Sequence, residues 1–206
     1  NAQLLADEEP ADNETVLTSG KGYSNVFHAN GGSASFSVMA NTLRGVYGTD
    51  VLLATANSFT GSVLQADYNK KMAASMIMPN GLMSRQRTMT GAELKETVRA
   101  FVEGCEGGFV PFNRGSLPVV SGIAVEVKEA GGSYTLTGIT RNGQPLRDDD
   151  TVTVTCLATE KQMEVLLASD SGTSAGEDMW VKNTWRDYVS GGGAALAEPE
   201  NYMTLR

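Results

Sequence analysis

Histidine is nearly absent from this sequence, which contains only His28 among its 206 residues. A two-metal hydrolytic centre needs several His and Asp ligands that hold two metal ions about 3.5 to 4 Å apart. A Ser-His-Asp or Cys-His arrangement needs a histidine beside a nucleophile, and no nucleophile-elbow motif accompanies this one. A lone histidine is usually a structural or surface residue. We therefore expect no catalytic residue, no metal ligand and no cofactor in this chain.

Cysteine is almost as scarce, with Cys105 and Cys156 alone. Two cysteines are too few for the disulfide framework of a small secreted domain. Both lie in apolar patterns, and free cysteine is among the most buried residue types, so two buried thiols are favoured over one bridge. The sequence leaves the pairing itself open.

Basic charge and long apolar runs are lacking too. The net charge of −8 argues against the clustered Lys and Arg that a nucleic-acid surface requires. No apolar run approaches the roughly 18 to 20 residues of a membrane span, and no basic-then-apolar leader opens the chain. The chain begins at Asn1 rather than at Met, which indicates a piece trimmed from a longer protein. We expect neither a nucleic-acid partner nor a membrane span.

The residues that are present indicate one large domain preceded by a short arm. Residues 1–22 are acidic and polar and show no periodicity, which predicts a flexible arm or an edge segment. Order is expected from Tyr23 onward, so residues 23–206 form the domain. A chain of this length is ample for a single core. The tail from Pro199 to Arg206 shows no periodicity and predicts coil.

The clearest local signal is a helix that starts at Thr90. The Thr90 side chain can cap the first free amides while Glu93 reaches back to the cap. Met89 and Leu94 stand where a hydrophobic staple would close. Apolar residues then recur at helical spacing as far as Cys105, and the following glycines predict the end of the helix.

Other elements follow from the same kind of pattern. A helical stripe from Phe36 to Tyr47 ends at Gly48 and precedes an apolar run short enough for a buried strand, Val51 to Ala54. Alternating residues on both sides of Ala130-Gly131-Gly132 predict a hairpin, and residues 151–157 predict a further strand. Together the elements indicate an α/β (α+β) fold, a mixed β-sheet packed with helices.

Three further segments each have a structural interpretation and a functional alternative. Asp148–Asp150 is expected to be a solvated turn, with calcium binding as the alternative. Gly31–Ser33 is expected to be an ordinary turn, with anion binding as the alternative. The final amphipathic helix, residues 181–189, has its apolar stripe toward the core, and both tryptophans are expected there rather than on a stacking platform.

The order of these elements resembles the C-terminal domain of the 5'-nucleotidases. The resemblance rests on the loop Met78-Pro79-Asn80-Gly81, the Thr-Gly-Ala-Glu-Leu-Lys helix start at residues 90–95, and the hairpin after Leu117. It also rests on the earlier helix and strand, followed by Asn57-Ser58 where the family has an Asn-Ser-Gly-Gly-x-Arg loop. The resemblance covers about residues 35–206 and implies the fold of that domain.

The resemblance is strong in the framework and poor in the pocket. In the family, two aromatic rings sandwich the base, the loop arginine meets the phosphate, and a Gly-Gly-Asp-Gly-Tyr loop closes the site. Here Phe59-Thr60-Gly61-Ser62 replaces Gly-Gly-x-Arg, and Asn80 stands where the first ring should be. Residues 160–167, Glu-Lys-Gln-Met-Glu-Val-Leu-Leu, replace the second ring and the glycine loop. Losing a phosphate contact and two stacking contacts costs several kcal/mol of binding, at about 1 to 3 kcal/mol each.

Some residues stand at positions that correspond, by the resemblance, to the ligand-binding positions of the family. These candidate ligand-binding residues are Asn57, Phe59, Asn80, Lys161, Gln162 and Met163. They offer one ring and one flexible ammonium, which cannot reproduce the fork of a guanidinium. The alternative is that residues 160–168 fold as a helix that fills the old cleft, with Met163 and Leu167 packed inward.

Two functional hypotheses follow from the resemblance. In the first, the chain is the substrate-recognition domain of a longer 5'-nucleotidase-like metallophosphoesterase of nucleotide catabolism. It is then excised from an N-terminal domain that holds the divalent metals, and its pocket for a nucleotide-like molecule is degenerate. In the second, it is a non-catalytic binding or interaction domain at the cell surface that kept the fold. By resemblance the protein is extracellular, periplasmic or bound to the cell surface.

Overall fold

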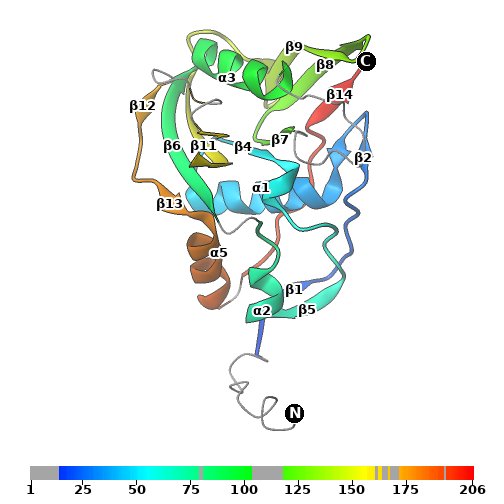
Figure 1. Ribbon diagram of the computed structural model, residues 1–206, viewed down its shortest axis with the longest axis vertical. Helices are drawn as coiled ribbons and strands as arrows, with labels where there is room; N and C mark the ends of the chain where they lie inside the picture. Colours follow the sequence, from blue (N-terminus) through cyan, green and yellow to red (C-terminus); the bar gives the residue numbers. More distant parts are fainter. Residues whose placement is uncertain are drawn as a thin grey trace.

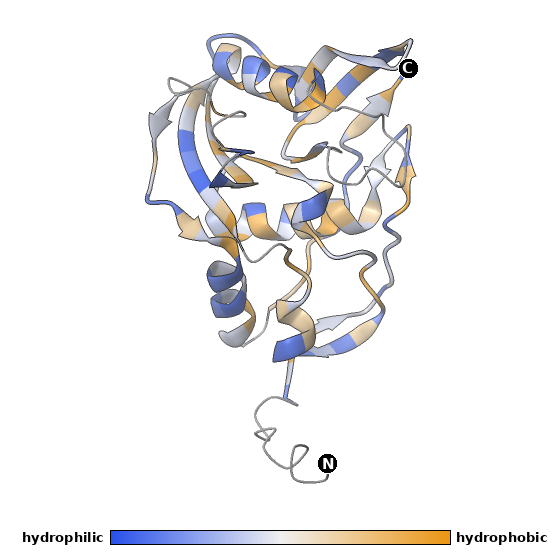
Figure 2. Ribbon diagram, in the orientation of Figure 1, coloured by the Kyte–Doolittle hydropathy of each residue, from blue (hydrophilic) through white to orange (hydrophobic). Residues whose placement is uncertain are grey.

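The computed structural model describes residues 14–78, 81–103, 118–160, 162–163, 167, 172–192 and 194–206. Within these residues the central sheet has the strand order β12-β6-β11-β4-β7, and β13 also pairs with β6 (Figure 1). The strands are β4 (Val51–Thr55), β6 (Leu82–Thr90), β7 (Pro118–Ser121), β11 (Thr151–Thr159), β12 (Thr173–Ser174) and β13 (Met179–Trp180). Figure 2 shows β4 as hydrophobic and the middle of β6 as hydrophilic.

The strand directions confirm the mixed sheet and define its two edges. β11 runs parallel to β4 and antiparallel to β6. Because β4 and β11 run in one direction, their carboxyl ends lie at the same side of the sheet. We call this side, which is formed by strand ends and not by an outer strand, the carboxyl edge. Both begin at the opposite edge, which we call the amino edge.

Helix α1 (Ala34–Tyr47) forms where the apolar stripe predicted it and packs on β4 and β7. It begins at Ser33, whose Oγ accepts a hydrogen bond from the amide of Phe36 at 3.5 Å. It ends at Gly48, which has φ 66°, a conformation that glycine adopts without strain. The adjoining residues 31–33 lead into this helix, and Gly32–Ser33 form a short strand. A Cβ on Gly32 would lie 2.3 Å from the ring of Tyr202, so only glycine fits there.

Helix α3 (Gly91–Glu103) has the predicted capping box. The amide of Thr90 donates to Glu93 Oε2 at 2.7 Å, and the amide of Glu93 donates to Thr90 Oγ1 at 3.3 Å. Met89 and Leu94 are both buried, as the staple requires. The predicted glycine stop and Cys105 lie outside the described residues. Cys156 is a free, buried thiol.

A second sheet has the order β10-β9-β8-β14. Its strands are β8 (Ala124–Ala130), β9 (Ser133–Arg141), β10 (Gln144–Pro145) and β14 (Met203–Leu205). The hairpin of β8 and β9 is the predicted one. The tail, however, is not coil throughout, because β14 pairs in parallel with β8 and the preceding Tyr202 is buried. This pairing joins segments about 80 residues apart, which no local pattern in the sequence reveals.

The expected N-terminal arm is also partly wrong. Residues 15–19 form β1 (Thr15–Ser19), which pairs antiparallel with β5 (Ala66–Asn69), and Leu17 is buried. Of the two interpretations offered for residues 1–22, an edge segment is the one that fits this part. The remaining short elements are β2 (Phe27–His28), β3 (Gly32–Ser33), the single turn η2 (Ala56–Ser58) and α2 (Lys70–Ala74).

Both tryptophans were expected in the core, but they have different environments. One lies in helix α5 (Val181–Ser190) and the other just before it. Trp185 is fully buried, and its Nε1 donates to the carbonyl of Ala73 in α2 at 2.7 Å. Trp180 lies on β13 instead and is 50% exposed, so the expectation is wrong for this residue. None of the helices in the described part of the chain has both the length and the apolar character needed to cross a membrane.

Candidate functional site

The carboxyl edge is the place where open α/β sheets bind ligands. Here β4 ends at Thr55 and passes into η2, whose Asn57 is exposed and whose Ser58 is buried. β11 ends at Thr159 beside the start of β6 at Leu82. The candidate residues from both loops therefore reach the same edge of the sheet.

Phe59 is part of the core rather than an open wall of a pocket. Its side chain is 5% exposed, and its ring lies on that of Phe36 in α1, with 6.3 Å between centroids and 29° between planes. The backbone of Phe59 forms a bridge with Ile77. A ligand that stacked on this ring would first have to displace α1 or rotate the ring out of the core.

The segment after β11 is held by a cap and packed inward. Gln162 Oε1 accepts hydrogen bonds from the amide of Thr159 at 3.1 Å and from the Thr159 hydroxyl at 3.0 Å. The amide of Leu167 donates to the carbonyl of Met163 at 2.9 Å, which is the spacing of a helical turn. Met163 is 1% exposed and Leu167 is also buried. Gln162 thus serves as a cap, and Met163 belongs to the hydrophobic core.

Of the six candidate residues, the structure places four at the carboxyl edge. Asn57 is solvent-exposed, Phe59 and Met163 are buried, and Gln162 is half-buried. Asn80 and Lys161 lie outside the described residues.

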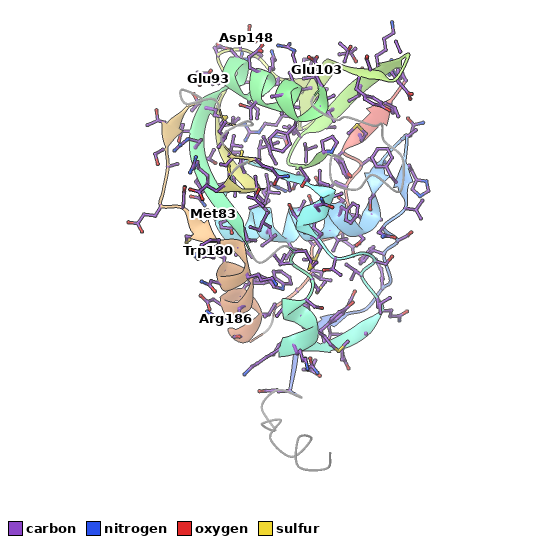
Figure 3. All side chains as sticks on the ribbon, in the orientation of Figure 1. Met83, Glu93, Glu103, Asp148, Trp180 and Arg186 are labelled. Atoms are coloured by element: carbon purple, nitrogen blue, oxygen red, sulfur yellow. The ribbon has the colours of Figure 1, made fainter. Side chains whose placement is uncertain are left out.

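The carboxyl edge also has features that the sequence did not indicate. The Ser58 hydroxyl is buried and has no hydrogen-bond partner among the described residues. An unsatisfied buried hydroxyl costs about 1 to 3 kcal/mol. The half-exposed Trp180 pairs with Met83 next to the start of β6, and the two side chains lie near each other in Figure 3. Trp180 is thus the exposed ring on the flank of this edge.

The charged and nucleophilic groups that the structure describes near this edge are paired or buried. Arg85 on β6 makes a two-pronged ion pair with Asp178, and the hydrogen bond from Arg85 lowers the pKa of the Asp178 carboxyl. Burial raises the pKa of the Cys156 thiol to about 12, so the thiol is protonated and unreactive. His28 is exposed on β2. No group of three or more His, Cys, Asp or Glu in the described ranges could hold a metal ion.

Comparison with known proteins identifies the fold. No family model and no curated protein matches the sequence. Solved structures do match over nearly the whole chain. The chain has the fold of a 5'-nucleotidase domain.

Three structural neighbours show the extent of this likeness. The 5'-nucleotidase precursor of Thermus thermophilus matches 99% of this chain and 41% of its own, with TM-score 0.67 and 13% identity. The NAD nucleotidase of Haemophilus influenzae matches 100% and 40%, with TM-score 0.65 and 14% identity. The sulfate thiohydrolase of Thermus thermophilus matches 99% and 37%, with TM-score 0.68 and 13% identity. The chain thus spans about two fifths of the length of these neighbours.

The match to the 5'-nucleotidase fold confirms the framework expected from the sequence, at identities that establish the fold alone. The sequence also contained one signal at the carboxyl edge that was not used. Thr159-Glu160-Lys161-Gln162 has the Thr-x-x-Gln spacing of a capping box, and such a box predicts a helical start after β11. The exposure of Trp180 had no such signal, because the residue stands one position before an amphipathic helix.

Proposed function

We propose that this chain is the substrate-side domain of a longer 5'-nucleotidase-like metallophosphoesterase, and that its ancestral nucleoside pocket is degenerate. The observation that carries the proposal is the packing of the carboxyl edge, where Phe59 and Met163 are both buried in the core. The length of the structural neighbours supports it, because about three fifths of each lies outside the match. The metal-dependent chemistry then belongs to an N-terminal domain of the parent protein.

Reopening the pocket would cost about as much free energy as stacking a base on the exposed ring restores. Exposing a buried aromatic side chain forfeits about 1.5 to 3 kcal/mol of burial. Stacking one base on one ring returns about 1 to 3 kcal/mol, so the exchange has no net gain. Trp180 is already exposed, yet it lies on the flank. Its strand, β13, pairs with β6, and the strands β6 and β11 separate it from β4, which leads into η2.

We also propose that the protein is exported to the periplasm, the cell surface or the medium. The 5'-nucleotidase neighbour from Thermus thermophilus is described as a precursor, which fits a protein that is processed during export. Fractionation of the native host, followed by detection of the chain with an antibody, tests this location. A purely cytosolic signal would contradict it.

Titration of the chain with nucleotides tests the pocket. AMP, adenosine and a UDP-sugar at low salt should give no saturable heat in calorimetry at micromolar concentrations. Trp180 offers a second readout, because a base that stacks on it changes its fluorescence while buried Trp185 stays constant. Micromolar binding of AMP that Phe59→Ala abolishes would overturn the degenerate pocket. Binding that only Trp180→Ala abolishes would place nucleotide recognition on the flank and leave the ancestral pocket degenerate.

An activity assay tests the absence of catalysis. The chain with added Mn²⁺ or Zn²⁺ should hydrolyse neither AMP nor a chromogenic phosphate ester above a no-protein control, because the described residues hold no metal-ligand cluster. The Thermus thermophilus 5'-nucleotidase under the same conditions is the positive control. Turnover by this chain would contradict the assignment of catalysis to another domain.

A further inference from the structure

A cavity of about 320 Å³ lies at the amino edge, away from the site that the fold family suggests. It is bounded by the last turns of α1, by the link from β7 to β8, and by the turn between β9 and β10. The polar side chains in its wall come from Arg44, Asp50, Arg141, Asn142, Glu200 and Asn201. The volume is at the small end of the range for ligand pockets, about 300 to 1,000 Å³.

Asp50 is fully used inside the protein. Its Oδ2 accepts hydrogen bonds from the amide of Thr153 at 2.8 Å and from the Thr153 hydroxyl at 3.0 Å. Its Oδ1 accepts one from Arg141. Partial burial works to raise the pKa of the Asp50 carboxyl, but the Thr153 bonds and the two nearby arginines outweigh it and lower the pKa. Asp50 is therefore an ionised anchor and has little capacity left for a ligand.

The two arginines, by contrast, have N–H donors that make no hydrogen bond in the described part of the chain. A guanidinium has five N–H groups. Arg44 uses Nε on Ser121 Oγ at 2.8 Å and Nη1 on the carbonyl of Asp50 at 3.5 Å, which leaves Nη2 without a bond in the described part. Arg141 uses Nη2 on Asp50, which leaves Nε and Nη1. Two guanidinium groups fixed by internal bonds, each with spare donors, are suited to an oxyanion.

Other residues that line the cavity have a different chemistry. Glu200 is held by its backbone, because its amide donates to Ser37 Oγ at 2.8 Å and its carbonyl accepts from the same hydroxyl at 2.9 Å. Its carboxylate has no partner in the described part of the chain and lines the cavity with Asn142 and Asn201. A carboxylate and two amides can bond neutral hydroxyl groups, whereas the carboxylate repels a second negative charge.

We propose that this cavity binds a small hydroxylated molecule with a single oxyanion group. The oxyanion, a phosphate or a carboxylate, lies between Arg44 and Arg141, and the neutral hydroxyl groups face Glu200 and the two asparagines. The site is independent of the carboxyl edge and of any nucleotide, since it rests on residues of the amino edge alone. A result that contradicts this proposal would therefore leave the proposed function unaffected, and the reverse also holds.

Calorimetry of the full chain with three matched probes tests this proposal. Glucose 6-phosphate represents the phosphate source, gluconate the carboxylate source, and glucose is the neutral control. At least one of the two anions should bind saturably and glucose should not. Loss of charge-assisted hydrogen bonds should weaken that binding by about tenfold or more in Arg44→Gln and in Arg141→Gln. Comparable binding of glucose, or no binding of either anion at millimolar concentrations, would overturn the proposal.

Control variants separate recognition from folding. Arg99→Gln removes an arginine on α3 that pairs with Glu96 and Glu103 outside the cavity, and it should leave the affinity unchanged. Glu200→Gln removes a like charge from a side chain that makes no bond in the described residues, so the variant should fold normally and bind the anion several-fold more tightly. If Arg141→Gln unfolds, Glu200→Gln still decides. Unchanged or weaker binding in Glu200→Gln would contradict the assigned orientation.

Discussion

The two edges of the central sheet are completed in opposite ways. At the carboxyl edge two apolar side chains are buried in the core, Phe59 against α1 and Met163 after β11. At the amino edge there is a cavity, and the ion pair of Arg141 with Asp50 forms part of its wall. Both edges belong to one sheet and one framework.

This difference separates the fold from the site it supports. Strand direction decides where the loops of an α/β sheet gather, and that part of the architecture matches the structural neighbours. Whether a site at such an edge is open depends on a few side chains in the loops, which change without altering the sheet. A framework match at 13% identity therefore informs little about the ligand.

Phe59→Ala is the most severe test of the proposal that the carboxyl edge is closed. Because the ring is buried on Phe36, its removal leaves a cavity, and we expect a loss of about 3 to 5 kcal/mol in the free energy of unfolding. Urea denaturation followed by circular dichroism measures it. Asn57→Ala, at an exposed position of the same loop, is the control and should shift stability by less than about 0.5 kcal/mol. A stable Phe59→Ala variant would mean that the ring faces an open site.

Met163→Ala should follow, with a loss of about 2 to 5 kcal/mol for a buried methionine. The reason is that Met163 anchors the turn after β11 to the core. Met78 is 49% exposed and provides the matched control, since Met78→Ala should have little effect on the same denaturation curve. Equal effects of the two variants would show that the segment after β11 does not seal the edge.

Asp50→Asn tests the amino edge and should cost less, about 1 to 2 kcal/mol after allowance for solvent screening of a side chain that is 36% exposed. The folded pKa of Asp50 lies below its ordinary value of 3.8. Its stabilisation is therefore present above pH 3.8 and disappears as the pH falls through the lower folded pKa.

Urea titrations over a pH series measure this convergence. The curves of the wild type and of Asp50→Asn should differ at neutral pH and approach each other below pH 3.8. Asp149→Asn, at a side chain that is 81% exposed, is the control and should follow the wild type throughout. A constant difference at every pH would show that the charge of Asp50 is not what stabilises the amino edge.

The smallest expected loss of stability comes from the Gln162 cap at the carboxyl edge. Gln162→Ala removes the acceptor for two hydrogen bonds from Thr159 and should cost about 1 kcal/mol. Gln162→Glu keeps an acceptor in the same place and should retain most of the stability. Thermal unfolding compares the wild type with the two variants. Equal midpoints for all three proteins would show that the Gln162 cap does not stabilise the fold.

Local signals in the sequence predicted the elements that local bonds define. The Thr90 and Glu93 capping box, the stop of α1 at Gly48 and the hairpin of β8 and β9 all formed as expected. β14 was not predicted and β1 was covered only by the alternative of an edge segment, because each depends on a partner strand far away in the sequence.

The same contrast holds for the two sites. The resemblance locates the carboxyl edge, and the spacing of Met163 predicts its inward packing as one of two alternatives. The cluster at the amino edge could not be found in this way. Arg44, Asp50 and Arg141 belong to a helix, a loop and a hairpin, and the structure alone brings them together.

The short strand β14 has a consequence for how the chain behaves as a separate molecule. β8 has seven residues, and its outer side is covered by only three residues of β14 and by the backbone bonds of the flanking Tyr202 and Arg206. A truncation that removed this last segment would bare a long strand with unsatisfied amides and carbonyls, and also the hollow over Gly32 that Tyr202 fills. Bare strands of this kind pair with copies of themselves, so the segment from Tyr202 to Arg206 protects the molecule against self-association.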